Sequence, residues 1–125
     1  MSARSRELAI LELAARRRSL FEWYAHEAVG RQIGLSKEEL NALQRGAPSA
    51  SLSGDEALVR DVVASLIEKR DLDDALFEVA KRALGEAPLM ELVALVGYYD
   101  LLALSLTVCR TPLPEGIDSP FISLG

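Results

Sequence analysis

The chain has 125 residues, of which 50% are hydrophobic, and its formal net charge is −5 at pH 7. This length suits one domain, and an acidic chain without a basic arm is a poor candidate for binding nucleic acid through phosphates. The single cysteine, Cys109, excludes an intrachain disulfide, which fits a reducing, cytoplasmic location. Glu7 and Glu12 interrupt the apolar N-terminal stretch, so we predict no signal peptide.

Helix signals mark most of the chain, and the alternating pattern typical of β-strands is absent. A first helix is predicted over Arg4–Arg16, and it should be buried because it is apolar on most sides. Ser19 and Glu22 match a capping box at the start of a second helix. Gly34 is expected to end that helix, as a glycine just beyond a helix commonly does.

The middle of the chain carries three further helix starts. Ser36–Glu39 is a second capping box, and the short helix that it begins should end at Gly46. A loop is predicted over 47–52, followed by a third capping box at Ser53–Glu56. Asp73 is placed to cap a fifth helix. The helix after the third box has an apolar stripe at helical spacing, formed by Leu58, Val59, Val62, Val63, Leu66 and Ile67.

The last predicted helix starts near Pro88, reaches about Cys109, and is long and apolar enough to suggest a membrane span. Glu91 and Asp100 lie within it, and a charge near mid-bilayer costs about 2.5–3.5 kcal/mol. We therefore predict a central core helix, buried all round and partly by other subunits, with no role for a membrane.

The segment after that helix has several prolines and no helical period. We predict an extended C-terminal arm, either loose or laid across a neighbouring subunit. The fold class expected from the whole chain is all-α: one domain of about six helices over 1–116, followed by the arm at 117–125.

The only histidine, His26, follows Glu22 by four residues, so their side chains can touch on one face of a helix. A carboxylate beside an imidazole fixes its tautomer, as a general acid–base histidine needs. The alternative is a capping glutamate followed by an ordinary, partly buried histidine. Glu7 has apolar neighbours on its helix face, so either it is buried with a partner or it is a first-turn glutamate at the surface. Glu12 precedes Arg16 by four residues, which favours a solvated surface pair.

Other polar residues give weaker signals. Asp100 is flanked by apolar residues, which favours a structural polar contact over a catalytic role. A contact between subunits is one form that it could take. Tyr98 and Tyr99 are interpreted as core residues, and Cys109 as a small buried hydrophobe. The chain has no set of metal ligands at familiar spacing and no glycine-rich phosphate loop, so we expect no metal and no cofactor.

Two segments carry a resemblance to a known family. RELAILELAARRRSLFEWYAHEAVGRQIGLSKEELNAL and, farther along, MELVALVGYYDLLALSLTV resemble the carboxymuconolactone decarboxylase family, which belongs to the AhpD-like alkylhydroperoxidase superfamily. The resemblance covers roughly Arg6–Gly116. It implies an AhpD-like helical bundle and a homo-oligomer, either a trimer or a hexamer.

The peroxidase branch of this superfamily uses a glutamate, a Cys-x-x-Cys motif and a histidine. By resemblance these positions fall on Glu7, on Ser19 and Glu22 in place of the cysteines, and on His26. Both redox cysteines are therefore missing, so thiol peroxidase chemistry of that type is not expected. A peroxiredoxin-type antioxidant activity remains an alternative at family level, for example through Cys109 or a partner's thiol.

The decarboxylase branch is similar to this chain in having Glu-x-x-x-His at that place. The resemblance implies a lyase that acts on a small lactone dicarboxylate. His26 would donate the proton, Glu22 would orient it and Glu7 would complete a relay, while Trp23 and Arg31 would contact the substrate. The other alternative is a non-catalytic helical oligomer that has kept the fold and lost the chemistry.

Overall fold

The computed structural model describes residues 1–117 and 119, and these residues form six helices and no strand. The all-helical prediction is therefore confirmed for this part of the chain. The helices are α1 (Ala3–Arg17), α2 (Leu20–Gln32), α3 (Lys37–Arg45), α4 (Asp55–Lys69), α5 (Asp74–Leu84) and α6 (Glu86–Val108). Most of the predicted arm, namely residues 118 and 120–125, lies outside the described residues.

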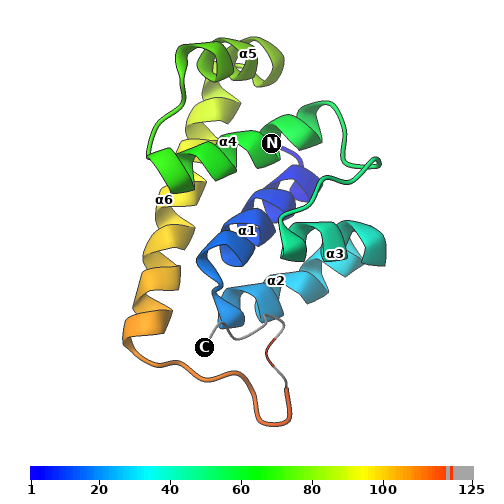
Figure 1. The fold of residues 1–125 in the computed structure, drawn as a ribbon, viewed down its shortest axis with the longest axis vertical. Coiled ribbons are helices and arrows are strands. Elements are labelled where there is room, and N and C mark those ends of the chain that lie inside the picture. Colours follow the sequence, from blue (N-terminus) through cyan, green and yellow to red (C-terminus); the bar gives the residue numbers. More distant parts are fainter. Residues whose placement is uncertain (118, 120–125) are drawn as a thin grey trace.

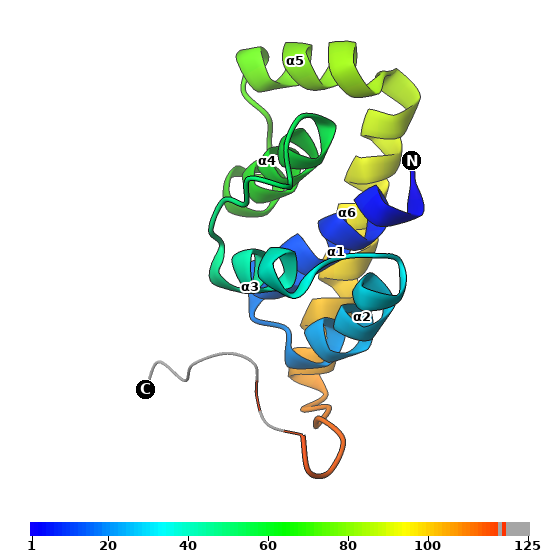
Figure 2. The same cartoon turned by 90° about the vertical axis from the view of Figure 1, so that its right-hand side faces the viewer.

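Helix α1 is the centre of the fold (Figure 1). Helix α4 packs on one side of it, α2 and α3 pack on the other, and the long α6 runs along its flank, as Figure 2 shows from a second side. Every residue from Glu7 to Ala14 is buried, so this helix is covered all round. The prediction of a buried first helix is confirmed.

Two hydrophobic clusters fill the space around α1. The first joins α1 to α4, α5 and α6, and it includes the apolar stripe predicted for α4. The second joins α1 to α2 and α3, and Leu52 from the loop before α4 closes it. Helix α1 thus contributes one face to each of the two clusters.

The three predicted capping boxes have different outcomes. Ser36 and Glu39 form the full box at the start of α3, so that prediction is confirmed. At α2 the box is wrong: Ser19 is the N-cap residue, but its side chain makes no capping hydrogen bond. At α4 it is also wrong, because the helix begins one residue later with Gly54 as its N-cap and Glu56 turns its carboxylate to another partner.

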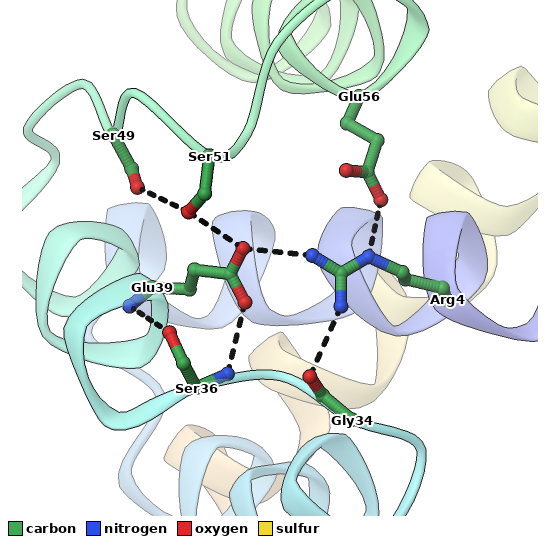
Figure 3. A network of polar contacts seen from close by, with 7 residues as sticks. All are labelled: Arg4, Gly34, Ser36, Glu39, Ser49, Ser51 and Glu56. Carbon is green, nitrogen blue, oxygen red and sulfur yellow. Dashed lines mark hydrogen bonds and ion pairs between the residues drawn. The ribbon is translucent and has the colours of Figure 1, made fainter.

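That other partner is Arg4, the centre of a polar network shown in Figure 3. Its Nε donates to Glu56 Oε2 at 2.5 Å, its Nη2 to Glu39 Oε2 at 2.8 Å and its Nη1 to the Gly34 carbonyl at 3.2 Å. Glu39 Oε2 also accepts a hydrogen bond from the Ser51 hydroxyl at 2.8 Å. One arginine thus ties the start of α1 to α3, to α4 and to the turn that ends α2.

Replacing Arg4 by methionine should lower the free energy of unfolding by about 1–2 kcal/mol at neutral pH, since three hydrogen bonds are lost from a partly exposed side chain.

This loss should depend on pH through Glu39. Burial alone would raise the pKa of Glu39, but hydrogen bonds from Ser36, Ser51 and Arg4 outweigh it and hold that pKa below its ordinary value. The stabilisation is therefore present above the ordinary carboxyl pKa and is lost as the pH falls through the lowered one. Urea unfolding at several pH values measures this loss. Arg6→Met is the matched control, because the Arg6 side chain is exposed and makes no hydrogen bond to a described residue. Equal losses in the two variants would contradict the network.

Helix α6 does not have the burial that was predicted for it. Only Leu89, Leu92, Val96 and Ala103 are buried, while Leu101 and Leu104 are 58% and 64% exposed. Within one chain the prediction of a central helix buried all round is wrong, because α1 takes that place and α6 covers only one of its flanks. By length and composition alone α6 could cross a membrane, but a single such helix is weak support for that.

Two smaller predictions also fail. Cys109, at the C-cap of α6, is exposed rather than buried, because the end of that helix extends past the core. Glu12 does pair with Arg16, with Arg16 Nε donating to Oε1 at 3.1 Å, but the carboxylate is only 2% exposed and is no surface group. It faces α4, where Arg60 supplies a second cation.

Candidate functional site

The single histidine lies where α1, α2 and α6 meet. Its Nδ1 is 2.8 Å from Oε2 of Glu7 on α1, and the two side chains are 20% and 11% exposed. Glu7 is buried and has a partner, which decides between the two alternatives left open for it. Because α1 is held on all sides, Glu7 is a fixed acceptor for this imidazole. The geometry favours a proton on Nδ1 and leaves Nε2 as the ring nitrogen available for a further contact.

Glu22 does not make the contact with His26 that its spacing suggests. It is 4% exposed, and neither of its carboxylate oxygens has a hydrogen-bond partner among the described residues. The Ser19 hydroxyl is near enough to favour the ionised form of Glu22 slightly, without the geometry of a hydrogen bond. The carboxylate that orients the imidazole is thus Glu7, whereas Glu22 lies buried one turn before it.

Burial raises the pKa of Glu22 to about 7, from 4.5 for an ordinary glutamate. The nearby His26 opposes this rise, whereas the negative charge of Asp100 adds to it. An unpaired buried carboxyl is costly to ionise, which is why the neutral form is favoured here. Groups that change their protonation near neutral pH occur often at sites of proton transfer.

Helix α6 contributes two aromatic residues next to the imidazole. The Tyr99 ring packs edge-on against the His26 ring with centroids 5.4 Å apart, and Tyr98 packs against Tyr99 in the same way at 5.2 Å. Tyr98 is 58% exposed, so its assignment to the core is wrong, while Tyr99 is partly buried. Both tyrosines and Arg6 line a surface hollow of about 360 Å³, which places open space one side chain away from His26.

Asp100, the next residue on α6, is held by Arg17. The guanidinium donates from Nε to Oδ1 at 2.7 Å and from Nη2 to Oδ2 at 3.0 Å, a two-point contact between the end of α1 and α6. The predicted structural contact of Asp100 is therefore confirmed, and it lies within one chain. The negative charge of this aspartate also helps to raise the pKa of Glu22.

The two residues expected to contact a substrate lie in different environments. Trp23 is 1% exposed and packs in the second hydrophobic cluster. Arg31 is exposed near the end of α2, and its side chain makes no hydrogen bond or ion pair to a described residue. Two arginines at the end of α1, Arg16 and Arg17, are bound to carboxylates.

Within the described part of the chain, no group of three or more histidine, cysteine, aspartate or glutamate side chains is placed to hold a metal ion. Tyr99 is a neighbour of His26 that sequence reasoning missed. It lies four helices farther along the chain, on α6, and a pair of adjacent tyrosines in an apolar helix is more often part of a core.

Together these observations define an all-helical domain with a carboxylate–imidazole pair and a second, near-neutral carboxyl at the junction of three helices. No protein-family model, no curated protein and no solved structure matches the chain. The resemblance to the carboxymuconolactone decarboxylase family therefore rests on the residues quoted above.

Proposed function

We propose that this protein is a non-redox acid–base enzyme of the carboxymuconolactone decarboxylase type, a lyase acting on a small oxygenated carboxylate or lactone. The observation that carries the proposal is the 2.8 Å contact between His26 Nδ1 and Glu7 Oε2. These two residues and Glu22 are the ones that the resemblance picks out, although 19 residues separate Glu7 from His26.

In the proposed reaction, the bond between the departing carboxylate and its carbon breaks and CO₂ leaves. The electron pair of that bond moves toward the lactone carbonyl, and the enolate that forms must then take a proton on carbon. His26 acts here in its doubly protonated, imidazolium form, with Nδ1–H held by Glu7. It gives the proton from Nε2, so a C–H bond forms as the Nε2–H bond breaks, and a neutral imidazole with its proton on Nδ1 remains. Solvent then returns the proton to the imidazole.

Glu22 has the second role in this proposal. With a pKa of about 7 it carries a proton about half of the time at neutral pH. Such a carboxyl can hold or release a proton with little cost, as a relay to His26 requires. Arg31, later on the same helix, is the proposed cation for a substrate carboxylate. Trp23 is buried and packs α2 against the second hydrophobic cluster.

Replacing His26 by glutamine should abolish CO₂ release from a lactone dicarboxylate, because no other imidazole exists in the chain. Glu7→Gln should lower the rate without abolishing it, since the amide oxygen can still accept from Nδ1 but carries no charge. CO₂ release is the measurement, and circular dichroism checks the fold of each variant. Undiminished turnover by His26→Gln would overturn the proposal.

A nitrogen-15 spectrum of the single imidazole supplies a control that needs no substrate. The wild-type ring should carry its proton on Nδ1, whereas Glu7→Leu should shift the neutral ring toward the Nε2 tautomer that histidine otherwise prefers. Peroxide consumption with a dithiol reductant, lost in Cys109→Ser, would instead favour the antioxidant alternative.

We also propose that the protein is a homo-oligomer in which copies cover the outer face of α6. In support, Met90, Leu101, Leu104 and Val108 are each about 60% exposed on that helix, which is unusual for apolar side chains gathered on one element. Sedimentation of the wild-type chain should give a trimer or hexamer, and Leu104→Glu should break it because a buried charge lacks a partner. Val79→Glu, on α5, is the control. A monomeric wild-type chain would contradict the assembly while leaving the chemistry untouched.

A further inference from the structure

A second group of charged side chains lies between α1, α4 and the loop that follows α3, away from His26. Its centre is Glu12, whose two oxygens are both in use: Oε1 accepts from Arg16 Nε and Oε2 from Arg60 Nε, each at 3.1 Å. Arg16 also contacts Glu68. Arg16 therefore has two carboxylate partners, whereas Glu12 is the one carboxylate that Arg60 contacts among the described residues.

Arg60 is the arginine with spare donors. Its side chain is 10% exposed, and its single hydrogen bond to a described residue is the one from Nε to Glu12. A guanidinium has five N–H groups, so the four on Nη1 and Nη2 have no described acceptor. Neither of these two nitrogens is among the buried side-chain atoms that lack a partner, so water or a ligand can reach them from the adjoining hollow.

The space beside Arg60 can hold such a ligand. A hollow of about 230 Å³ opens there, with Arg60, Arg16 and Asp61 on one side and the loop residues Pro48 and Ser49 on the other. Neither Glu7, Glu22 nor His26 lines it. Asp61 is exposed and makes no hydrogen bond or ion pair to a described residue, so the hollow offers both a free guanidinium fork and a free carboxylate.

The charges around the hollow select among anions. Arg16 and Arg60 are outnumbered by Glu12, Asp61 and the Glu68 that pairs with Arg16, so the surroundings of the hollow have no net positive charge to hold a dianion such as phosphate. A planar carboxylate matches the two parallel N–H groups of a guanidinium. A hydroxyl or ammonium beside that carboxylate would donate to Asp61, which otherwise repels an anion.

From this arrangement we infer that the hollow is a binding site for a small monocarboxylate that carries a hydroxyl or ammonium group on the neighbouring carbon. Its carboxylate accepts from Arg60 Nη1 and Nη2, and its donor group faces Asp61. The site is separate from the proposed acid–base centre and does not depend on it.

Calorimetric titration of the full chain with lactate, alanine, propionate and inorganic phosphate tests this inference. Lactate and alanine should bind with saturation. Propionate should bind about tenfold more weakly because it lacks the donor to Asp61, and phosphate about tenfold more weakly because of its excess negative charge. Arg60→Lys keeps a cation beside Glu12 but loses the fork, so lactate should bind it about tenfold more weakly.

Asp61→Asn leaves the contacts of Glu12 intact, so it remains informative if Arg60→Lys fails to fold. In that variant lactate should lose its advantage over propionate. His26→Gln should bind all four probes as the wild type does, which separates this site from the proposed catalytic one. Absence of saturable binding, tighter binding of phosphate than of lactate, or unchanged binding in both Arg60→Lys and Asp61→Asn would each overturn the inference.

Discussion

Replacing Glu22 by glutamine should stabilise the protein relative to the wild type by about 3 kcal/mol more at about pH 8 than at about pH 4. The effect arises because burial raises the pKa of this carboxyl to about 7 in the folded chain, whereas an ordinary glutamate has 4.5. Glutamine has nearly the same shape and cannot ionise, so it removes the cost of a buried, unpaired charge and keeps the packing.

The sign of the pH dependence follows from proton binding. Between the two pKa values of Glu22 the folded protein keeps a proton that the unfolded chain has lost. The contribution of this group to stability therefore falls as the pH rises from about 4.5 to about 7, and it stays constant above that range. Groups that do not interact with Glu22 titrate in the same way in both proteins and cancel in the difference.

Urea unfolding of both proteins at the two pH values measures this difference. Glu38→Gln serves as the control, since Glu38 is exposed and makes no hydrogen bond to a described residue. Its unfolding free energy should differ from the wild type by the same small amount at either pH. If the wild type and Glu22→Gln have parallel pH profiles, Glu22 is not a buried, near-neutral carboxyl and loses its proposed relay role.

Replacing Glu12 by glutamine should lower the free energy of unfolding by about 3–5 kcal/mol, because it leaves the buried Arg60 guanidinium without its counter-charge. Arg16 contributes less to this loss, since it is partly exposed and keeps Glu68 as a partner. Urea or thermal unfolding at neutral pH measures the change.

Two further variants separate a buried charge from a simple loss of contacts. Glu68→Gln also removes a carboxylate bound to Arg16, but Glu68 is 56% exposed, so the cost should stay below about 1 kcal/mol. The double variant Glu12→Met with Arg60→Met should recover most of the stability, because apolar side chains can replace a buried ion pair. A Glu12→Gln protein as stable as Glu68→Gln would contradict the burial of this group.

Local sequence signals predicted where the helices lie better than which partners their side chains contact. The pattern Ser-x-x-Glu occurs at Ser19, Ser36 and Ser53, yet only the second forms a full capping box. At the third, the glutamate bonds Arg4, which lies 52 residues earlier in the chain. A four-residue pattern carries no information about a partner at that distance, so it predicts where a helix begins but not where the glutamate points.

The same limit applies to the candidate site and to the centre of the fold. Spacing and resemblance singled out Glu7, Glu22 and His26, but the contact that forms is the one between two helices rather than the one within α2. Burial could not be read from composition either: α6 is more apolar than α1 and is nevertheless the more exposed of the two. What decides burial is the number of neighbours that the chain places around a helix.

The central place of α1 has a consequence for how the chain is made. Arg17 and Asp100, which join α1 to α6, are 83 residues apart, so at about 5–20 residues per second α1 is synthesised on the order of 5–15 seconds before its last neighbour. Until then, part of its apolar surface faces water. A chain interrupted after α5 would keep that surface exposed, and such a fragment is the form of this protein most prone to aggregate. Among the described helices, the last to be synthesised, α6, is thus the one that completes the burial of α1.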